Sequence, residues 1–445
     1  MKLFQQMLVA GATLSLIAPI SAQASNIVDL EEIGSYSRST KKSSRLDSNS
    51  FTNKISGSAS LKKSSRIDSK TFINEVNEET AKGSTETPDF QQNPIEAGTF
   101  SDTTVMDGKA VMWAGSIDGG NEYNESESTS TGYTFTLNLN TSFTGDDNLY
   151  VRLKTGEQGD IWKNKGTYHI ETKDNSNGFE MDKVWYTFSP IENMTAFVGP
   201  RIENYYMYIT PSIYKPGALK SFKLGGNSNF GASTDMGAGF KYELDNGLGF
   251  ATNVVEKGAD SNTGIFAPGS QLKWDTQVAY TQDNWHISGT YSKARDWSSH
   301  SYNATTLAAN AAPHSAGIAL RAYWIPEEYG TQIPDVSVGY DTKDYGGQAT
   351  GEVEKATSYM IGLQWKDMFQ PDDRIGFAYT QPLAATEVSG GGATNEVSPN
   401  VLEIYYSFRP NDSMEITPAI IAGNNILGDD DDDIYGLLVT SKFKF

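Results

Sequence analysis

The stretch that decides the fold is GYTFTLNLNTSF, residues 132–143. Its large apolar side chains share one face: Tyr133, Phe135, Leu137, Leu139 and Phe143. The opposite face is polar and carries Thr134, Thr136, Asn138, Asn140 and Ser142. Successive side chains of a β-strand point to opposite faces, so this alternation predicts a strand with one apolar and one polar face.

The next residues continue the pattern as a hairpin. TGDDN at 144–148 is rich in turn-forming residues, and LYVRLKT at 149–155 alternates again. Leu149, Val151 and Leu153 oppose a face with Tyr150, Arg152 and Lys154. The polar face therefore continues across the turn.

The same unit recurs to the end of the chain. Strand-like stretches lie at 181–188, 194–200, 236–244, 248–256, 271–281, 285–294, 316–325, 335–343, 358–366, 374–381, 401–408, 414–421 and 435–445. Short connections alternate with long ones at 118–130, 156–179, 201–232, 257–270, 295–313, 344–356, 383–399 and 423–433. With a strand at 103–117, the pattern predicts an all-β transmembrane antiparallel barrel of about sixteen strands, with both termini on the periplasmic side. A soluble β-sandwich is the alternative, but it does not need two-faced strands throughout.

Composition supports this class. The chain has no cysteine, 42 glycines, 23 Tyr, 20 Phe and 8 Trp, with a mean hydropathy of −0.47. Barrels need aromatic residues at both membrane interfaces and polar residues inside. The net charge of −20 argues against a nucleic-acid partner. The four histidines lack metal-ligand spacing, so we predict no metal site and no cofactor.

The N-terminal quarter divides into two segments ahead of the barrel domain at 99–445. Residues 1–24 predict a signal peptide, with Lys2, an apolar stretch at 7–20 and a cleavage motif at 22–24. Residues 25–98 are rich in Ser and Lys and predict a disordered periplasmic segment. The segment repeats KKSSRLDSNSF (41–51) as KKSSRIDSKTF (62–72). This repeat, 41–72, is either a basic arm that weakly contacts peptidoglycan or a duplicated linker.

Five stretches together resemble the porins of marine cyanobacteria: MKLFQQMLVAGA, TTVMDGKAVMWAG, LNTSFTG, DKVWYTF and VGPRIENYYMY. Those proteins are grouped with the carbohydrate-selective (OprB-like) porins. Residues 25–98 depart from the family because they show no S-layer-homology domain and no coiled coil ahead of the barrel. The resemblance implies a homotrimer in the outer membrane, in contact with lipid and lipopolysaccharide.

The last strand ends YGLLVTSKFKF at 435–445. Its apolar face carries Tyr435, Leu437, Val439, Phe443 and Phe445, and Leu438 is an exception on the polar face. A final aromatic residue after alternating apolar residues resembles the signal that outer-membrane barrels present to the barrel-assembly machinery. We therefore expect Phe443 and Phe445 to serve assembly, and the last strand to close against the first.

The third long loop, 201–232, resembles in position the loop that folds into the pore of sixteen-stranded porins. Its constriction candidates are Arg201, Glu203, Tyr205, Tyr208, Tyr214, Lys215, Lys220 and Lys223. The predicted polar face adds basic pore-wall candidates at Arg152, Lys154, Lys183, Lys241, Lys273, Arg321 and Arg374, and acidic ones at Glu243, Asp275 and Glu403. On one interpretation these groups form a narrow zone that favours anions, or that favours sugars stacked on Tyr and hydrogen-bonded by Arg. On the other, the loop is a solvated surface loop whose charges select nothing.

The function predicted from these features is passive diffusion of small hydrophilic solutes such as sugars and inorganic ions. We expect weak anion preference and no tight binding site. One alternative is a structural barrel that links the outer membrane to the cell wall. Another is a barrel enzyme, although no nucleophile motif such as G-x-S-x-G occurs. An energy-coupled receptor would need more strands and a plug domain.

Overall fold

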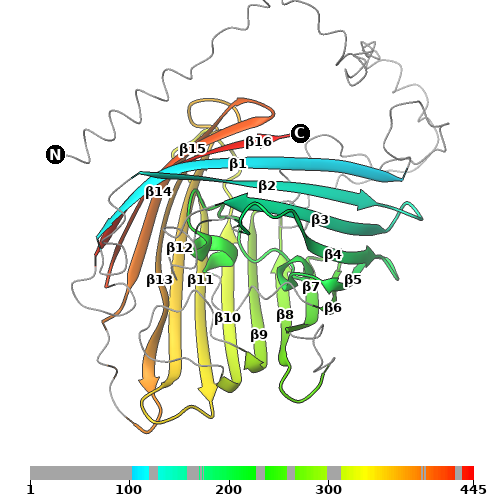
Figure 1. The fold of residues 1–445 in the computed structure, drawn as a ribbon, viewed down its shortest axis with the longest axis vertical. Helices are drawn as coiled ribbons and strands as arrows, with labels where there is room; N and C mark the ends of the chain where they lie inside the picture. The colour runs from blue at the N-terminus through cyan, green and yellow to red at the C-terminus, as the bar shows by residue number, and fades with distance from the viewer. Residues whose placement is uncertain are drawn as a thin grey trace, which may run out of the picture. The chain divides into compact units, whose positions relative to one another are not determined.

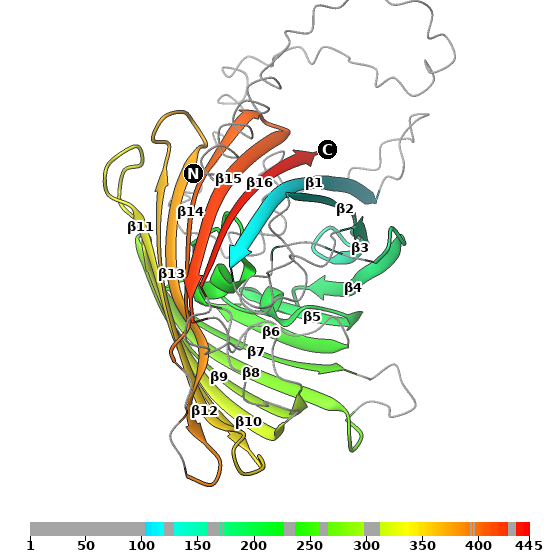
Figure 2. The ribbon, with the colours of Figure 1, turned by 60° about the vertical axis from the view of Figure 1, so that its left-hand side comes forward.

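The computed structural model describes residues 103–119, 129–157, 170, 173, 175–226, 236–257, 266–297, 312–391, 394, 397–425 and 433–445. These ranges form a closed antiparallel barrel (Figures 1 and 2). The signal peptide, the segment at 25–98 and its repeat lie outside the described residues. No helix in the described ranges is both long enough and apolar enough to cross a membrane.

Sixteen strands make up the barrel, which confirms the predicted fold class and number. They are β1 (Thr104–Gly119), β2 (Ser130–Thr141), β3 (Asn148–Glu157), β4 (Glu180–Phe188), β5 (Met194–Arg201), β6 (Gly237–Glu243), β7 (Leu248–Lys257), β8 (Gln271–Thr281), β9 (Trp285–Trp297), β10 (Ala312–Trp324), β11 (Asp335–Gly346), β12 (Val353–Lys366), β13 (Arg374–Val388), β14 (Asn400–Asn411), β15 (Met414–Asn424) and β16 (Ile434–Lys444). Each strand pairs with its neighbours in sequence, and β1 also pairs with β16.

The barrel closes between the first and last strands, as the sequence predicts. In that register Val111 lies opposite Lys442 and Gly115 lies opposite Leu438. The chain end continues the ladder, because Phe445 and Gly108 exchange backbone hydrogen bonds at 2.9 and 3.1 Å. Closure leaves no sheet edge in the described barrel, which is the condition for a sheet to survive in lipid.

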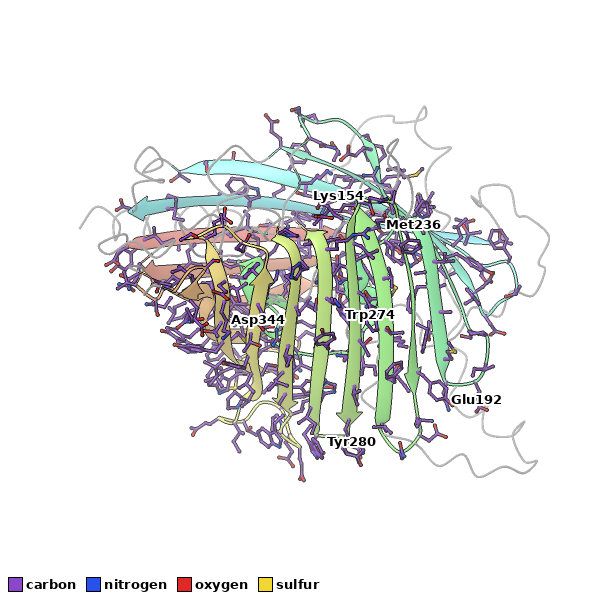
Figure 3. The ribbon with its side chains drawn as sticks, turned by 90° about the horizontal axis from the view of Figure 1, so that it is seen from below. Lys154, Glu192, Met236, Trp274, Tyr280 and Asp344 are labelled. Carbon is purple, nitrogen blue, oxygen red and sulfur yellow. The ribbon has the colours of Figure 1, made fainter. Side chains whose placement is uncertain are left out.

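The two faces of the strands differ as expected. On β8 the side chains of Trp274, Val278 and Tyr280 are 45%, 54% and 36% exposed on the outside, and Figure 3 labels the two aromatic residues. The alternate positions Lys273 and Asp275 are buried inside the barrel. Polar residues therefore line the interior, and apolar residues cover the surface that faces lipid in a transmembrane barrel.

The main apolar core lies inside the barrel, between the wall and the third long loop. It contains Trp113, Ile117, Ile170, Tyr214, Ala218, Leu219, Phe222, Met360, Ala378, Val401, Tyr405, Ala419, Ile421, Ile434 and Leu438. Leu438 is fully buried there, which explains its position on the otherwise polar face of β16. An apolar patch on an aqueous wall gives the loop a surface to pack against.

The described part of that loop, 202–226, runs inside the ring of strands (Figures 1 and 2). It contains two short 3₁₀ helices, η2 (Asn204–Met207) and η3 (Lys220–Gly225). Glycines allow it to approach the wall closely. A Cβ at Gly339 on β11 would lie 1.8 Å from the carbonyl oxygen of Gly225, so only glycine fits there.

Candidate solute constriction

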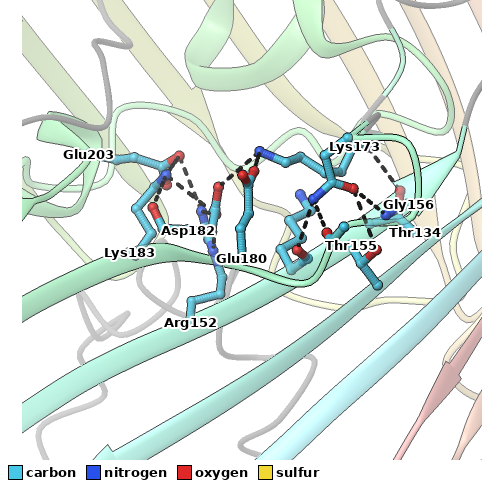
Figure 4. A network of polar contacts seen from close by, with 12 residues as sticks. Thr134, Arg152, Thr155, Gly156, Lys173, Glu180, Asp182, Lys183 and Glu203 are labelled. Atoms are coloured by element: carbon cyan, nitrogen blue, oxygen red, sulfur yellow. Dashed lines mark hydrogen bonds and ion pairs between the residues drawn. The ribbon is translucent and has the colours of Figure 1, made fainter.

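The start of the loop is attached to the wall by a buried ion-pair network, which Lys173 and Glu180 extend (Figure 4). Arg152 Nε donates to Asp182 Oδ2 at 2.6 Å, and its Nη2 lies 3.3 Å from Glu203 Oε1. Lys183 Nζ lies 3.2 Å from the same Glu203 oxygen. Burial alone raises the pKa of Glu203, but Lys183 and Arg152 outweigh it and hold the pKa below its ordinary value. Lys173 also lies 3.8 Å from Asp182 and pairs with Glu180, so cations and carboxylates alternate through the network.

The middle of the loop is held by β8. Tyr208 Oη donates to Asp275 Oδ2 at 2.6 Å, and Asn204 Nδ2 donates to the same oxygen at 2.8 Å. The Gln277 amide bonds Ile209 twice, accepting from its N–H at 2.8 Å and donating to its carbonyl at 3.0 Å. A side-chain amide that satisfies both backbone groups of one residue fixes the loop locally in the manner of a paired strand.

A single carboxylate on β14 binds the far part of the loop. Glu403 accepts hydrogen bonds from the Tyr214 hydroxyl at 2.9 Å and from the backbone N–H of Gly217 at 3.0 Å. Its second oxygen accepts from the N–H groups of Ala218 and Leu219 at 3.1 and 3.0 Å. Glu403 is fully buried, and these four donors occupy its acceptor positions. The sequence placed Glu403 on the pore wall but gave no sign of this attachment.

The end of η3 is bound by Arg321 of β10. Its Nε donates to the Leu224 carbonyl at 2.7 Å, and its Nη2 contacts both oxygens of Asp341 at 2.8 and 3.0 Å. Arg321 is 3% exposed. The Arg321 guanidinium therefore binds the loop carbonyl and the Asp341 carboxylate together.

Three of the four tyrosines of the loop are buried. Tyr206, Tyr208 and Tyr214 are 1–2% exposed. Tyr206 packs on Trp185 with ring centroids 4.6 Å apart, and Tyr205 stacks on Tyr206 at 4.8 Å. These rings pack against protein, so the described geometry gives no support to the interpretation that tyrosines of this loop stack on sugars.

Three more of the predicted basic wall residues lie inside the barrel near acidic groups. Lys241 Nζ is 3.6 Å from Glu243, Lys273 Nζ is 3.7 Å from Asp275, and Arg374 Nη2 is 3.5 Å from Glu415. Arg201 is exposed at the end of β5. The backbone N–H of Lys215 donates to Gln364 at 3.0 Å.

A narrow cavity lies between the loop and the wall formed by β1, β2, β3 and β16. Five lysines line it, Lys109, Lys154, Lys220, Lys223 and Lys442, and its volume is about 80 Å³. Its other lining residues are Val111, Trp113, Thr134, Ile170, Pro216, Gly217, Ala218, Leu219, Leu438 and Thr440. We call these residues the lysine cavity. No Asp or Glu is among the described residues that line it.

The lysine cavity combines residues that the sequence predicted with two that it did not. Lys154, Lys220 and Lys223 were candidates. The sequence did not single out Lys109 and Lys442, although both stand on the inward face of their strands, four positions from Trp113 and two from Thr440 respectively. The alternation of β1 and β16 could have identified them. Within the described ranges no group of three or more His, Asp or Glu side chains could hold a metal ion.

Comparison with known proteins identifies the fold. No protein-family model matches the chain. The chain is 25% identical over 410 residues to an uncharacterized protein of Nostoc sp. (81% of this chain, 69% of the relative). It is also 25% identical over 366 residues to an uncharacterized protein of Synechocystis sp. (73% of this chain, 65% of the relative).

Solved structures with the same architecture are outer-membrane porins. Pseudomonas putida OprB aligns with a TM-score of 0.54 and 12% identity, over 77% of this chain and 94% of OprB. The anion-selective porin of Comamonas acidovorans aligns with a TM-score of 0.51 and 11% identity, over 77% and 99% of the two chains. The trimer form of Vibrio cholerae OmpT aligns with a TM-score of 0.50 and 9% identity, over 77% of this chain and 99% of OmpT. The fold is a porin fold.

Proposed function

We propose that this protein is an outer-membrane channel through which small hydrophilic solutes diffuse passively. The observation that carries the proposal is the inward-folded loop 202–226. It is bound to the barrel wall at Arg152, Asp275, Arg321 and Glu403. A polar barrel with a fixed internal loop sorts solutes by width and by electric field, without bond chemistry. We propose no catalytic role.

The field at the loop favours anions over cations. The five lysines of the lysine cavity come from both the loop and the wall. Charges in distant loops are screened over about 8 Å at physiological salt, whereas charges in a narrow, poorly hydrated space act more strongly. The total charge of −20 is therefore a poor guide to selectivity. We infer that inorganic anions pass most readily, and the preference for sugars implied by the OprB-like resemblance is secondary.

The cellular setting of the channel is also inferred. We place the barrel in the outer membrane as a homotrimer, in contact with lipid and lipopolysaccharide, with residues 25–98 in the periplasm. OmpT, of similar fold, has a trimer form. The aromatic chain end pairs with β1, and we propose that Phe443 and Phe445 are recognised by the barrel-assembly machinery. The 41–72 repeat remains a candidate for weak peptidoglycan contact.

Single-channel recording in planar bilayers tests the channel proposal. Purified protein should give discrete conductance steps, and a salt gradient should give a reversal potential of the sign for anion preference. Heat-modified protein, unfolded before addition, is the control and should give no steps. If folded protein inserts but conducts no ions, the barrel is better explained as a structural link between outer membrane and cell wall.

A further inference from the structure

We infer that a groove on the outer face of β8–β11 binds one acyl chain of a phospholipid from the periplasmic leaflet of the membrane. The inference rests on the proposed placement of the barrel in the outer membrane. It goes beyond the general contact of a barrel with lipid, because it assigns one saturable lipid site to one part of the wall.

The groove has a volume of about 600 Å³, within the range of about 300–1,000 Å³ that is usual for ligand sites. Its two side walls are formed by outward-facing side chains that are 36–54% exposed. They are Val278, Tyr280 and Ile287 on β8 and β9, and Leu320, Val338 and Tyr340 on β10 and β11. With the two small residues of its floor, Gly289 and Ala322, we call this feature the outer groove.

Register explains why the wall is hollow at the floor. Gly289 pairs with Val278 on β8 and with Leu320 on β10. Ala322 pairs with Ile287 on β9. The two smallest side chains thus lie in rows of large ones. Among the described residues, a Cβ at Gly289 would meet only a Leu320 methyl carbon, at 3.6 Å.

A second outward glycine shows how the chain itself can fill such a space. A Cβ at Gly108 of β1 would lie 2.5 Å from the ring of Phe445. The terminal ring therefore covers Gly108, whereas the described side chains leave Gly289 open. The outer groove is left for an occupant that does not belong to the described barrel.

Two tryptophans indicate the depth of the outer groove in the membrane. Trp285 at the start of β9 pairs with Trp324 at the end of β10, and their side chains are 38% and 42% exposed. Trp is enriched where the hydrocarbon meets the headgroups. Ile287 and Gly289 follow Trp285 on β9, at most about 7 and 13 Å further along the strand at about 3.3 Å per residue. Half of the hydrocarbon core measures about 15 Å. The outer groove therefore lies in the leaflet next to the short turns, which is the periplasmic one in outer-membrane barrels.

An acyl chain suits this position better than water or a folded partner. The hydrocarbon region holds no water that could fill the space. The outer groove is continuous with the lipid-facing surface that carries Trp274 on β8. A narrow, flexible chain can contact both walls and the floor at once, and each contact adds dispersion attraction. A chain in the outer groove should therefore exchange more slowly than chains that lie against the neighbouring ridges.

The test counts the phospholipids bound to the full-length folded barrel in detergent by native mass spectrometry. Dipalmitoyl phosphatidylglycerol is the probe, and one molecule should bind along a saturable curve before others do. Phosphatidylethanolamine with the same chains should bind equally, because the chain is what the site holds. Preferential retention of lipopolysaccharide would overturn the assignment to the periplasmic leaflet. Failure of both phospholipids to bind saturably would overturn the inference, whereas the channel proposal is tested separately by conductance.

Substitutions locate the site. Ala322→Phe should fill the floor and raise the half-saturating phospholipid concentration by about tenfold or more, equivalent to about 1.4 kcal/mol. Ala322→Leu adds less volume and should act in the same direction if the Phe variant does not fold. Ala238→Phe is the matched control, because Ala238 is exposed on the outside of β6 but does not line the outer groove. An equal loss of binding in the control would overturn the inference. Dissociation of an oligomer by Ala322→Phe, seen on unheated gels, would identify the occupant as a second copy of the chain and overturn it too.

Discussion

The Glu403 carboxylate on β14 accepts a hydrogen bond from the Gly217 backbone N–H at 3.0 Å, across 186 positions of sequence. The bond joins the barrel wall to the loop that lies inside it. Three further donors share the same carboxylate. Glu403 is therefore the residue on which the position of residues 214–219 most depends.

Replacing Glu403 by Gln should loosen the loop. The amide nitrogen of Gln cannot accept, so buried backbone N–H groups lose their partner at about 1–3 kcal/mol. We expect larger and noisier single-channel conductance and a lower temperature for the heat-induced gel shift. Glu192→Gln is the control, because Glu192 is exposed in the turn between β4 and β5 (Figure 3). Wild-type conductance in the Glu403 variant would show that the loop is held by other contacts.

Adding one methyl group at Gly339 should displace the end of the loop. A Cβ there would lie 1.8 Å from the Gly225 carbonyl oxygen, and backbone cannot move aside cheaply. Gly339→Ala should destabilise the barrel by about 1–3 kcal/mol, as overpacking usually does, and alter conductance. Gly289→Ala provides the comparison, since its Cβ would meet only Leu320 at an ordinary 3.6 Å. The heat-induced gel shift measures stability, and equal shifts for the two variants would contradict the packing described here.

The end of the chain gives a third prediction. The Phe445 ring stacks on Phe135 with centroids 5.6 Å apart, and its backbone closes the ladder with Gly108. Phe445→Ala should lower the amount of folded barrel in the outer membrane while export continues. Phe143→Ala is a suitable control, because Phe143 is 66% exposed in a turn. Cell fractionation with heat-modifiability gels measures the outcome. Wild-type insertion of the Phe445 variant would rule out an assembly role for the terminal ring.

The strands could be predicted from sequence because their signal is local. Alternation at 132–143 identifies inward and outward faces without knowledge of any partner. The contacts of the loop are not local. Nothing near Glu403 indicates that it binds Gly217, because a buried acid on an inward face looks like any other pore-wall charge. Tyr208 and Tyr214 suggested sugar stacking by composition, and only the fold shows that they are buried.

The lysine cavity also could be predicted only in part from the sequence. Lys220 and Lys223 were noticed because they cluster in one loop. Lys109 is the one lysine of β1, whereas β16 carries Lys442 and Lys444, and these lysines meet only when β1 closes on β16. Clusters of charge in a barrel depend on closure and on strand register. Alternation predicts the face on which a side chain lies, but not which side chains lie beside it on the neighbouring strands.

The last prediction concerns ion selectivity, where local and total charge disagree. Replacing Lys215, Lys220 and Lys223 by Glu reverses three charges in the loop, two of them lining the lysine cavity. Reversal potentials under a salt gradient should then shift from anion to cation preference. The control replaces Asp429–Asp433 by Asn; of these only Asp433, directly before β16, belongs to the described residues. This control removes five negative charges, nearly as large a change as the six units of the lysine variant. Because screening limits the reach of a charge to about 8 Å, we expect the aspartate change to move the reversal potential little. A larger effect of the aspartates would place the selective region away from residues 202–226, and the constriction proposed here would have to be abandoned.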